Sequence, residues 1–200
     1  VWSDERGYHS HGSVRMEYYC ERIAKGGINT SPNFSFRTTG PCTGIYEDDV
    51  MPTKDGGIGY GIRRLMAERA TSARHAIDIA IDLLGKYGYF SEGRTYTVAD
   101  SKEAWQIAIH QGNTWVARRV KDNEVVYIPN NFMMNHVDAT DTENVIVAPG
   151  MIERAIKNGR YKPAVPGVYN DFNFRVAVAP AERRAAGYNL SRNNLAWKKL

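Results

Sequence analysis

The sequence predicts an α+β domain whose strands are mainly antiparallel. Three observations indicate this class: residues 93–132 alternate between apolar and polar side chains, short polar turns interrupt the alternation, and two amphipathic helices precede it. Strands joined by short turns pair antiparallel, whereas parallel strands need long crossover connections. The order of strand, helices, strand meander and helix is typical of a domain in which helices cover an antiparallel sheet.

One strand and two helices are expected before the meander. Residues 33–39 (NFSFRTT) alternate as a strand does, and a helical region opens at residues 55–57. Thr71 or Ser72 supplies the N-cap of a second helix, which runs to about Tyr87. The inward-facing residues of the two helices are Ile58, Ile62, Leu65, Met66, Ala76, Ile77, Ala80, Ile81 and Leu84.

The meander contains four expected strands. Turns rich in Asp, Asn and Gly separate them, as is usual between neighbouring antiparallel strands. The last strand leads into the sequence PNNF, whose two asparagines form a polar pair at the end of a buried strand. We expect catalytic residues at this place. The expected strands cover residues 96–99, 105–110, 115–120 and 125–128.

A second group of elements is expected after the meander. Pro149 and Gly150 begin a helix over residues 151–157, and the Pro- and Gly-rich residues 163–169 form a loop. Residues 172–178 are expected as a strand, and residues 181–200 are polar with a helix at the end. The chain as a whole, residues 1–200, is expected to form one domain.

Composition excludes several classes of protein. The chain has 42% hydrophobic and 24% charged residues, a net charge of +4 and a pI of about 9.0, which is ordinary for a soluble domain. The charges are mixed and no nucleic-acid-binding module is recognisable, so we expect no nucleic-acid partner. No apolar run is long enough to span a membrane. The chain begins with Val1 and stops within a helix-like stretch, which suggests a processed or truncated piece of a longer protein.

No metal or cofactor is predicted. His9 and His11 alternate as a metal pair on a strand would, but no third ligand is near them in sequence, and exposed loop histidines are expected. The acidic residues 47–49 lack the spacing of a dedicated calcium loop and are expected to be solvated. Cys20 and Cys42 are too few for a disulfide framework and leave the compartment, cytoplasmic or exported, open.

Four segments, in this order, resemble the dipeptidase A family of cysteine-type peptidases. They read DGGIGYGIRRLMAERATSARHAIDIAIDLLGKYGY, RTYTVADSKEAWQIAIHQGNTWVARRV, VVYIPNNF and NGRYKP. The resemblance covers about residues 55–161 and trails on to residue 200. These peptidases are N-terminal-nucleophile (Ntn) hydrolases related to penicillin V acylase and bile salt hydrolase.

The resemblance implies a fold and a reaction. The fold is the four-layer αββα Ntn sandwich, with the meander in one of its antiparallel sheets, and this chain forms part of that larger domain. The reaction is hydrolysis of an amide bond in a small peptide substrate. The nucleophile of the family is an N-terminal cysteine whose own α-amino group, with an unperturbed pKa near 8, acts as the base.

The sequence departs from the family pattern at its start. Residue 1 is Val rather than Cys, so the nucleophile is expected on a segment outside these 200 residues. Cys42 precedes Thr43 and Gly44 and looks superficially like the family's Cys-Thr start. Family members carry a structural cysteine near that position, and the structural role is expected for Cys42.

Asn130 is the expected catalytic residue. Related acylases place an asparagine at the end of the corresponding strand in the oxyanion hole, so the resemblance implies that Asn130 donates an N–H to the developing oxyanion. The alternative is an asparagine that only caps the strand end. Arg118 or Arg119 could bind a substrate carboxylate, but the expected role of each is a cross-strand ion pair. Trp105 and Trp115 are expected in the hydrophobic core.

Three hypotheses about function follow. The first is a cysteine-type dipeptidase, for which this chain carries the scaffold. The second is a catalytically inactive homologue that serves as a binding or assembly module. The third is an acylase that acts on another C–N amide. Oligomeric state, including a homo-oligomer, is left open by the sequence.

Overall fold

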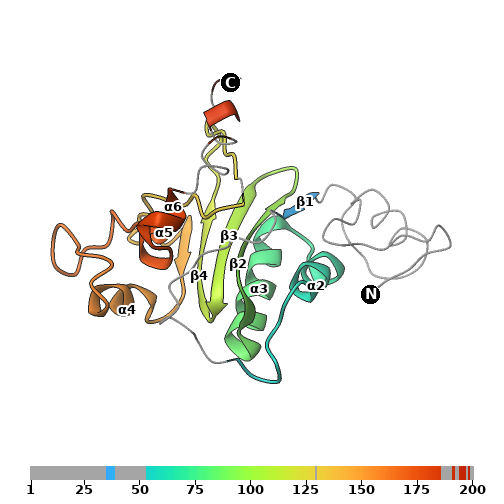
Figure 1. Ribbon diagram of the computed structural model, residues 1–200. Coiled ribbons are helices and arrows are strands. Elements are labelled where there is room, and N and C mark those ends of the chain that lie inside the picture. Colours follow the sequence, from blue (N-terminus) through green and yellow to red (C-terminus); the bar gives the residue numbers. More distant parts are fainter. Residues whose placement is uncertain are drawn as a thin grey trace.

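The computed structural model describes residues 53–128, 130–185, 191, 194–196 and 198, and the backbone of residues 35–38. Its centre is a five-stranded sheet in which the order in space follows the order in the chain, β1-β2-β3-β4-β5 (Figure 1). Every neighbouring pair is antiparallel, which confirms the predicted α+β class with an antiparallel sheet. The strands are β1 (Ser35–Thr38), β2 (Tyr89–Ala99), β3 (Ala104–Gly112), β4 (Thr114–Arg119) and β5 (Val145–Val147).

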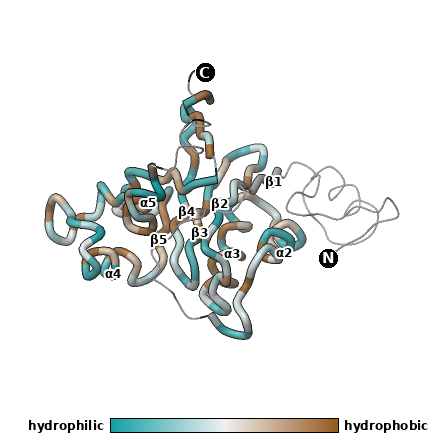
Figure 2. Tube along the Cα trace, in the orientation of Figure 1, coloured by the Kyte–Doolittle hydropathy of each residue, from teal (hydrophilic) through white to brown (hydrophobic). Residues whose placement is uncertain are grey.

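Two helices cover one face of this sheet. These are α2 (Gly61–Arg69) and α3 (Ala73–Tyr87), and α3 packs on β2 and β3. The side chain of Ser72 caps α3 by accepting a hydrogen bond from the His75 backbone N–H at 3.1 Å, which confirms one of the two predicted caps. Buried and exposed residues alternate around α3, and the same alternation is visible as hydropathy in Figure 2. Its buried residues are Ala73, Ala76, Ile77, Ala80, Leu83 and Leu84.

Three shorter helices lie away from α2 and α3, on the left of Figure 1. They are α4 (Met151–Lys157), α5 (Phe174–Val178) and α6 (Ala181–Arg184). Helix α4 has the predicted bounds. Two short segments join α5 to the rest: Val137 exchanges two backbone hydrogen bonds with Phe172, and Arg175 donates its backbone N–H to the Met134 carbonyl at 3.0 Å.

Two predicted strands are absent from the described structure, and each absence has a physical reason. Residues 125–128 are not a strand because β5, which was not predicted, takes the place beside β4, with Val145 opposite Arg118. Residues 172–178 contain the helix α5 instead. The Asn173 side chain accepts a hydrogen bond from the Val176 backbone N–H at 3.0 Å and so caps a helical turn that the apolar alternation does not reveal.

Two boundaries also differ from prediction. Residues 55–57 form a turn with positive φ at all three positions rather than a helix start, and α2 begins at Gly61. Strand β2 begins at Tyr89, and its pairing with β3 is irregular between Tyr89 and Gly93. Predictions for His9, His11, Cys20, Cys42 and residues 47–49 lie outside the described residues.

Asp100, in the turn between β2 and β3, ties this hairpin to the start of α3. Its carboxylate accepts hydrogen bonds from the backbone N–H groups of Ala73 at 2.7 Å, Lys102 at 2.8 Å and Glu103 at 3.1 Å. Burial opposes the charged form, but these N–H groups outweigh it and hold the pKa of Asp100 below its usual range.

Replacing Asp100 with Asn should destabilise the fold by about 1–2 kcal/mol at pH 7, because one charged acceptor of three hydrogen bonds is lost. A depressed folded-state pKa stabilises the fold above the unfolded-state pKa, and this contribution is lost as the pH falls through the folded-state value. The penalty should therefore shrink below about pH 4. Urea unfolding at pH 7 and pH 3 measures it, and Asp82→Asn, at an exposed position on α3, is the matched control. A penalty independent of pH would contradict the role of the carboxylate charge.

Candidate functional site

The face of the sheet opposite α3 is polar. On the α3 side, the guanidinium of Arg74 lies 5.0 Å from the ring centroid of Trp105, so the alternate residues of β3 point the other way. Gln106 on that other side faces Thr97 on β2 and Arg118 on β4, and His110 faces Thr114. We call the following set the polar face: Thr95, Thr97, Gln106, His110, Thr114 and Arg118.

Most of the polar face is buried. His110 is 0% exposed, and Thr95, Gln106 and Thr114 are each 2% exposed. Buried polar side chains destabilise a fold unless they find hydrogen-bond partners, so a sheet built only for packing would carry apolar residues here. These polar side chains are therefore covered by other parts of the protein, and Gln106 and Thr114 find hydrogen-bond partners there.

A line of hydrogen bonds crosses three strands at one end of the polar face. Gln106 Nε2 donates to Thr97 Oγ1 at 3.5 Å, and Arg118 Nη2 donates to Gln106 Oε1 at 3.2 Å. Arg118 also forms an ion pair with Glu124, with Nη2 to Oε1 at 2.8 Å. The expected ion-pair role of Arg118 is confirmed, although its partner comes from the segment after β4 rather than from a neighbouring strand.

Arg119 lies on the opposite face and is also paired. Its Nη2 is 2.8 Å from Asp122 Oδ1, and its Nε is 3.6 Å from Glu103 Oε2. Glu103 accepts a further hydrogen bond from the indole N–H of Trp105 at 2.8 Å. Trp105 and Trp115 are each 2% exposed, which confirms that both are core residues.

The segment that carries Asn130 is held against the sheet by Phe132. The Phe132 ring lies so close to Gly93 of β2 that a Cβ at Gly93 would stand 2.4 Å from Phe132 Cζ. The ring also packs on Phe174 of α5, at 5.2 Å between ring centroids in an edge-to-face arrangement. Asn130 is partly buried and Asn131 is 3% exposed.

Asn130 therefore sits in an irregular segment and not at the end of a strand, which corrects the structural context predicted for it. Its place in the sequence, two residues before Phe132, brings it near the edge of the polar face that Gly93 and His110 mark, since these two residues face each other. A carboxamide beside a buried polar surface is able to donate hydrogen bonds to a developing negative charge. Its catalytic role stays a prediction.

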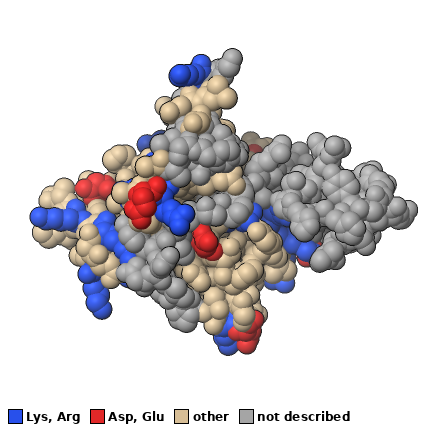
Figure 3. Space-filling model, viewed as in Figure 1, with Lys and Arg blue, Asp and Glu red and all other residues tan. Residues whose placement is uncertain are grey.

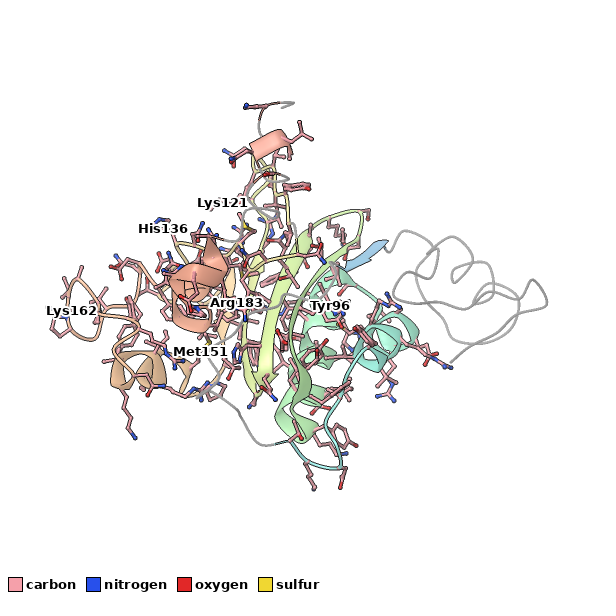
Figure 4. All side chains as sticks on the ribbon, in the orientation of Figure 1. Tyr96, Lys121, His136, Met151, Lys162 and Arg183 are labelled. Carbon is pink, nitrogen blue, oxygen red and sulfur yellow. The ribbon has the colours of Figure 1, made fainter. Side chains whose placement is uncertain are left out.

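Two residues of this region were not singled out by the sequence. His110 is wholly buried, and Thr114 accepts a hydrogen bond from Arg154 Nη2 of α4 at 2.6 Å. The alternation of β3 places His110 on the same side as Gln106, but only the pairing of β3 with β4 shows that Thr114 lies opposite. Figure 4 shows the side chains around the sheet, with Tyr96 on the α2 and α3 side and Met151 at the start of α4.

Within the described part of the chain, no group of three or more metal-ligating side chains comes together. Among the same residues, no helix is long and apolar enough to cross a membrane.

Comparison with known proteins gives one family and two kinds of relative. The sequence profile of peptidase family C69 matches residues 38–200. A ureidoglycolate dehydrogenase (NAD(+)) of Escherichia coli is 36% identical over 109 residues, which are 54% of this chain and 29% of that protein. A probable dipeptidase of Salmonella dublin is 28% identical over 144 residues, 72% of this chain and 32% of that protein. A probable dipeptidase B of Streptococcus pyogenes is 28% identical over 117 residues, 58% of this chain and 23% of that protein. The chain thus spans about a third or less of the length of these relatives.

Proposed function

Because the chain belongs to peptidase family C69, we propose that the protein hydrolyses the amide bond of dipeptides with a cysteine nucleophile. The observation that carries this proposal is the family match over residues 38–200. The dipeptidases of Salmonella dublin and Streptococcus pyogenes agree with it. The name of the Escherichia coli relative indicates a different chemistry, and we give it less weight because that chemistry disagrees with the family that matches most of the chain.

The proposed reaction has two steps. The α-amino group of an N-terminal cysteine takes the thiol proton, and the sulfur attacks the scissile carbonyl to form a tetrahedral intermediate. Asn130 donates an N–H to the oxyanion of that intermediate. The C–N bond then breaks, the leaving amine takes the proton, and water hydrolyses the resulting thioester. Neither Cys20 nor Cys42 is the nucleophile in this proposal.

We also propose that the sheet is one inner layer of a four-layer αββα sandwich. The layer formed by α2 and α3 supports this, because it covers one face of an antiparallel sheet whose other face is polar. In such a sandwich the polar face points toward the second sheet, and Asn130 lies at the opening between them.

Dipeptide turnover by the native protein tests the proposed function. We expect hydrolysis of unblocked dipeptides, complete loss of it after alkylation with iodoacetamide, and retention of it in Cys42→Ala. Turnover that resists alkylation would exclude a thiol nucleophile. Hydrolysis of acylated amines but not of dipeptides would identify an acylase, and absence of both activities would leave the binding-module hypothesis standing.

A further inference from the structure

Two arginines meet where α5 and α6 join. Nη2 of Arg175 donates to the backbone carbonyl of Arg184 at 2.8 Å, and Nη1 of Arg184 donates to the carbonyl of Ala179 at 2.6 Å. Ala179 is the C-cap of α5 and Arg184 is the last residue of α6, so each guanidinium is fixed at the end of a helix. A guanidinium has five N–H donors, and each of these two uses one of them in these contacts.

The charge of this pair is not balanced by the surrounding described residues. The ion pairs found in the described part of the chain involve neither Arg175 nor Arg184. Arg175 Nε is buried and has no hydrogen-bond acceptor. Burial, and then the nearby charge of Arg184, lower the pKa of Arg175. Two like charges with a buried unsatisfied donor destabilise the apo protein unless an anion joins them.

The stretch of chain around the pair is basic overall. Basic side chains outnumber acidic ones along residues 151–185, although Figure 3 shows red as well as blue atoms over the part of the molecule that α4, α5 and α6 form. The carboxylate of Asp171 in this stretch is already engaged by the hydroxyl of Tyr161. Glu182 of α6 is exposed.

The arginine pair is also connected to the segment that carries Asn130. The backbone N–H of Arg175 bonds the Met134 carbonyl at 3.0 Å, and the neighbouring Phe174 packs on Phe132. Helix α5 thus presents Arg175 on an element that is fixed to residues 130–134. Helix α5 and the segment that carries Asn130 are therefore in direct contact at Met134 and Phe132.

We propose that Arg175 and Arg184 bind a carboxylate, and that it is the free C-terminal carboxylate of the peptide on which the enzyme acts. The second half of this proposal rests on the proposed function. Planar guanidinium groups match the two oxygens of a carboxylate, and charge-assisted hydrogen bonds are about twice as strong as neutral ones. This site selects peptides that end within reach of the arginine pair, and therefore favours short peptides with an unblocked C-terminus.

Binding of alanyl-alanine and of alanyl-alanine amide tests the proposal, and it is measured by calorimetry on the native protein after iodoacetamide treatment, which stops any turnover of the dipeptide. The two ligands differ only in the terminal carboxylate. We expect the free dipeptide to bind at least about tenfold more tightly than the amide. Arg175→Gln and Arg184→Gln should each abolish this preference without weakening binding of the amide. Arg183→Gln, which removes the same charge from an exposed position near α5 (Figure 4), should keep it.

Several results would overturn the proposal. Equal binding of the two ligands by the wild-type protein is one, binding of neither is another, and a preference that survives both Gln variants is a third. The melting temperatures of all variants are compared first. If Arg175→Gln is unfolded, Arg175→Lys replaces it, because lysine keeps the charge but lacks the planar guanidinium. Because binding needs no turnover, a carboxylate preference in a protein that hydrolyses no dipeptide would contradict the proposed function and leave the carboxylate site intact.

Discussion

Replacing Asn130 with Ala should lower kcat for a dipeptide by about a hundredfold or more, with a smaller effect on KM. The expected loss, about 3 kcal/mol of transition-state stabilisation, follows if the carboxamide donates to an oxyanion that exists only after the nucleophile has attacked. Steady-state kinetics with one unblocked dipeptide measure it. The melting temperature should change little because Asn130 is only partly buried.

Two further variants show whether the effect belongs to Asn130. Asn135→Ala removes an exposed carboxamide from the same segment and should leave kcat unchanged. Asn131→Ala removes the adjacent, 3% exposed carboxamide and should lower stability more than activity. If Asn130→Ala keeps full kcat and Asn131→Ala loses it at an unchanged melting temperature, the oxyanion donor is Asn131 and the assignment to Asn130 is wrong.

Replacing Gly93 with Ala should destabilise the fold by about 3 kcal/mol. The added Cβ would lie 2.4 Å from Phe132 Cζ and 2.8 Å from the carbonyl oxygen of Ile109, and the second of these atoms belongs to the backbone of β3 and cannot move aside. The φ of +157° at Gly93 is a further strain for an L-residue. Urea unfolding gives the free energy, and any retained activity should fall because Phe132 must shift.

Gly85 offers a control for this substitution on the other side of the sheet. It lies within α3, and a Cβ there would meet no atom within 4 Å. Gly85→Ala should therefore stabilise the protein by up to about 1 kcal/mol through helix propensity. If the two substitutions have the same effect, the close approach of Phe132 to Gly93 does not determine the cost.

Local sequence patterns predicted those elements whose limits depend only on nearby residues in the chain. The alternation of β3 and β4, the cap at Ser72 and the bounds of α4 are each set by neighbours in the chain, and each was predictable. The strand expected at residues 125–128 failed for a non-local reason, since β5 occupies the position beside β4. Alternation of apolar and polar residues shows that a segment is able to join a sheet. It does not show which of two such segments takes the position beside a given strand.

The candidate site was predictable only in part. The family resemblance pointed to Asn130, but the polar face depends on register across three strands, which no local pattern contains. Gln106 and Arg118 are twelve residues apart and become neighbours only when β3 and β4 pair. The pairing of Arg175 with the end of α6 was equally out of reach, because its sequence suggested a strand.

The strand order of the sheet has a consequence for how the protein folds. Strands β3 and β4 each pair with the strand that precedes them in the chain, through turns of only a few residues. Closing such short loops costs little chain entropy, so this part of the sheet has low contact order and should form early. Strands β1 and β5 must instead return across longer connections, and Asp100 joins the early hairpin to the first turn of α3. We therefore expect the β2–β3 hairpin and α3 to form first, and the segment that bears Asn130 to become ordered on them later.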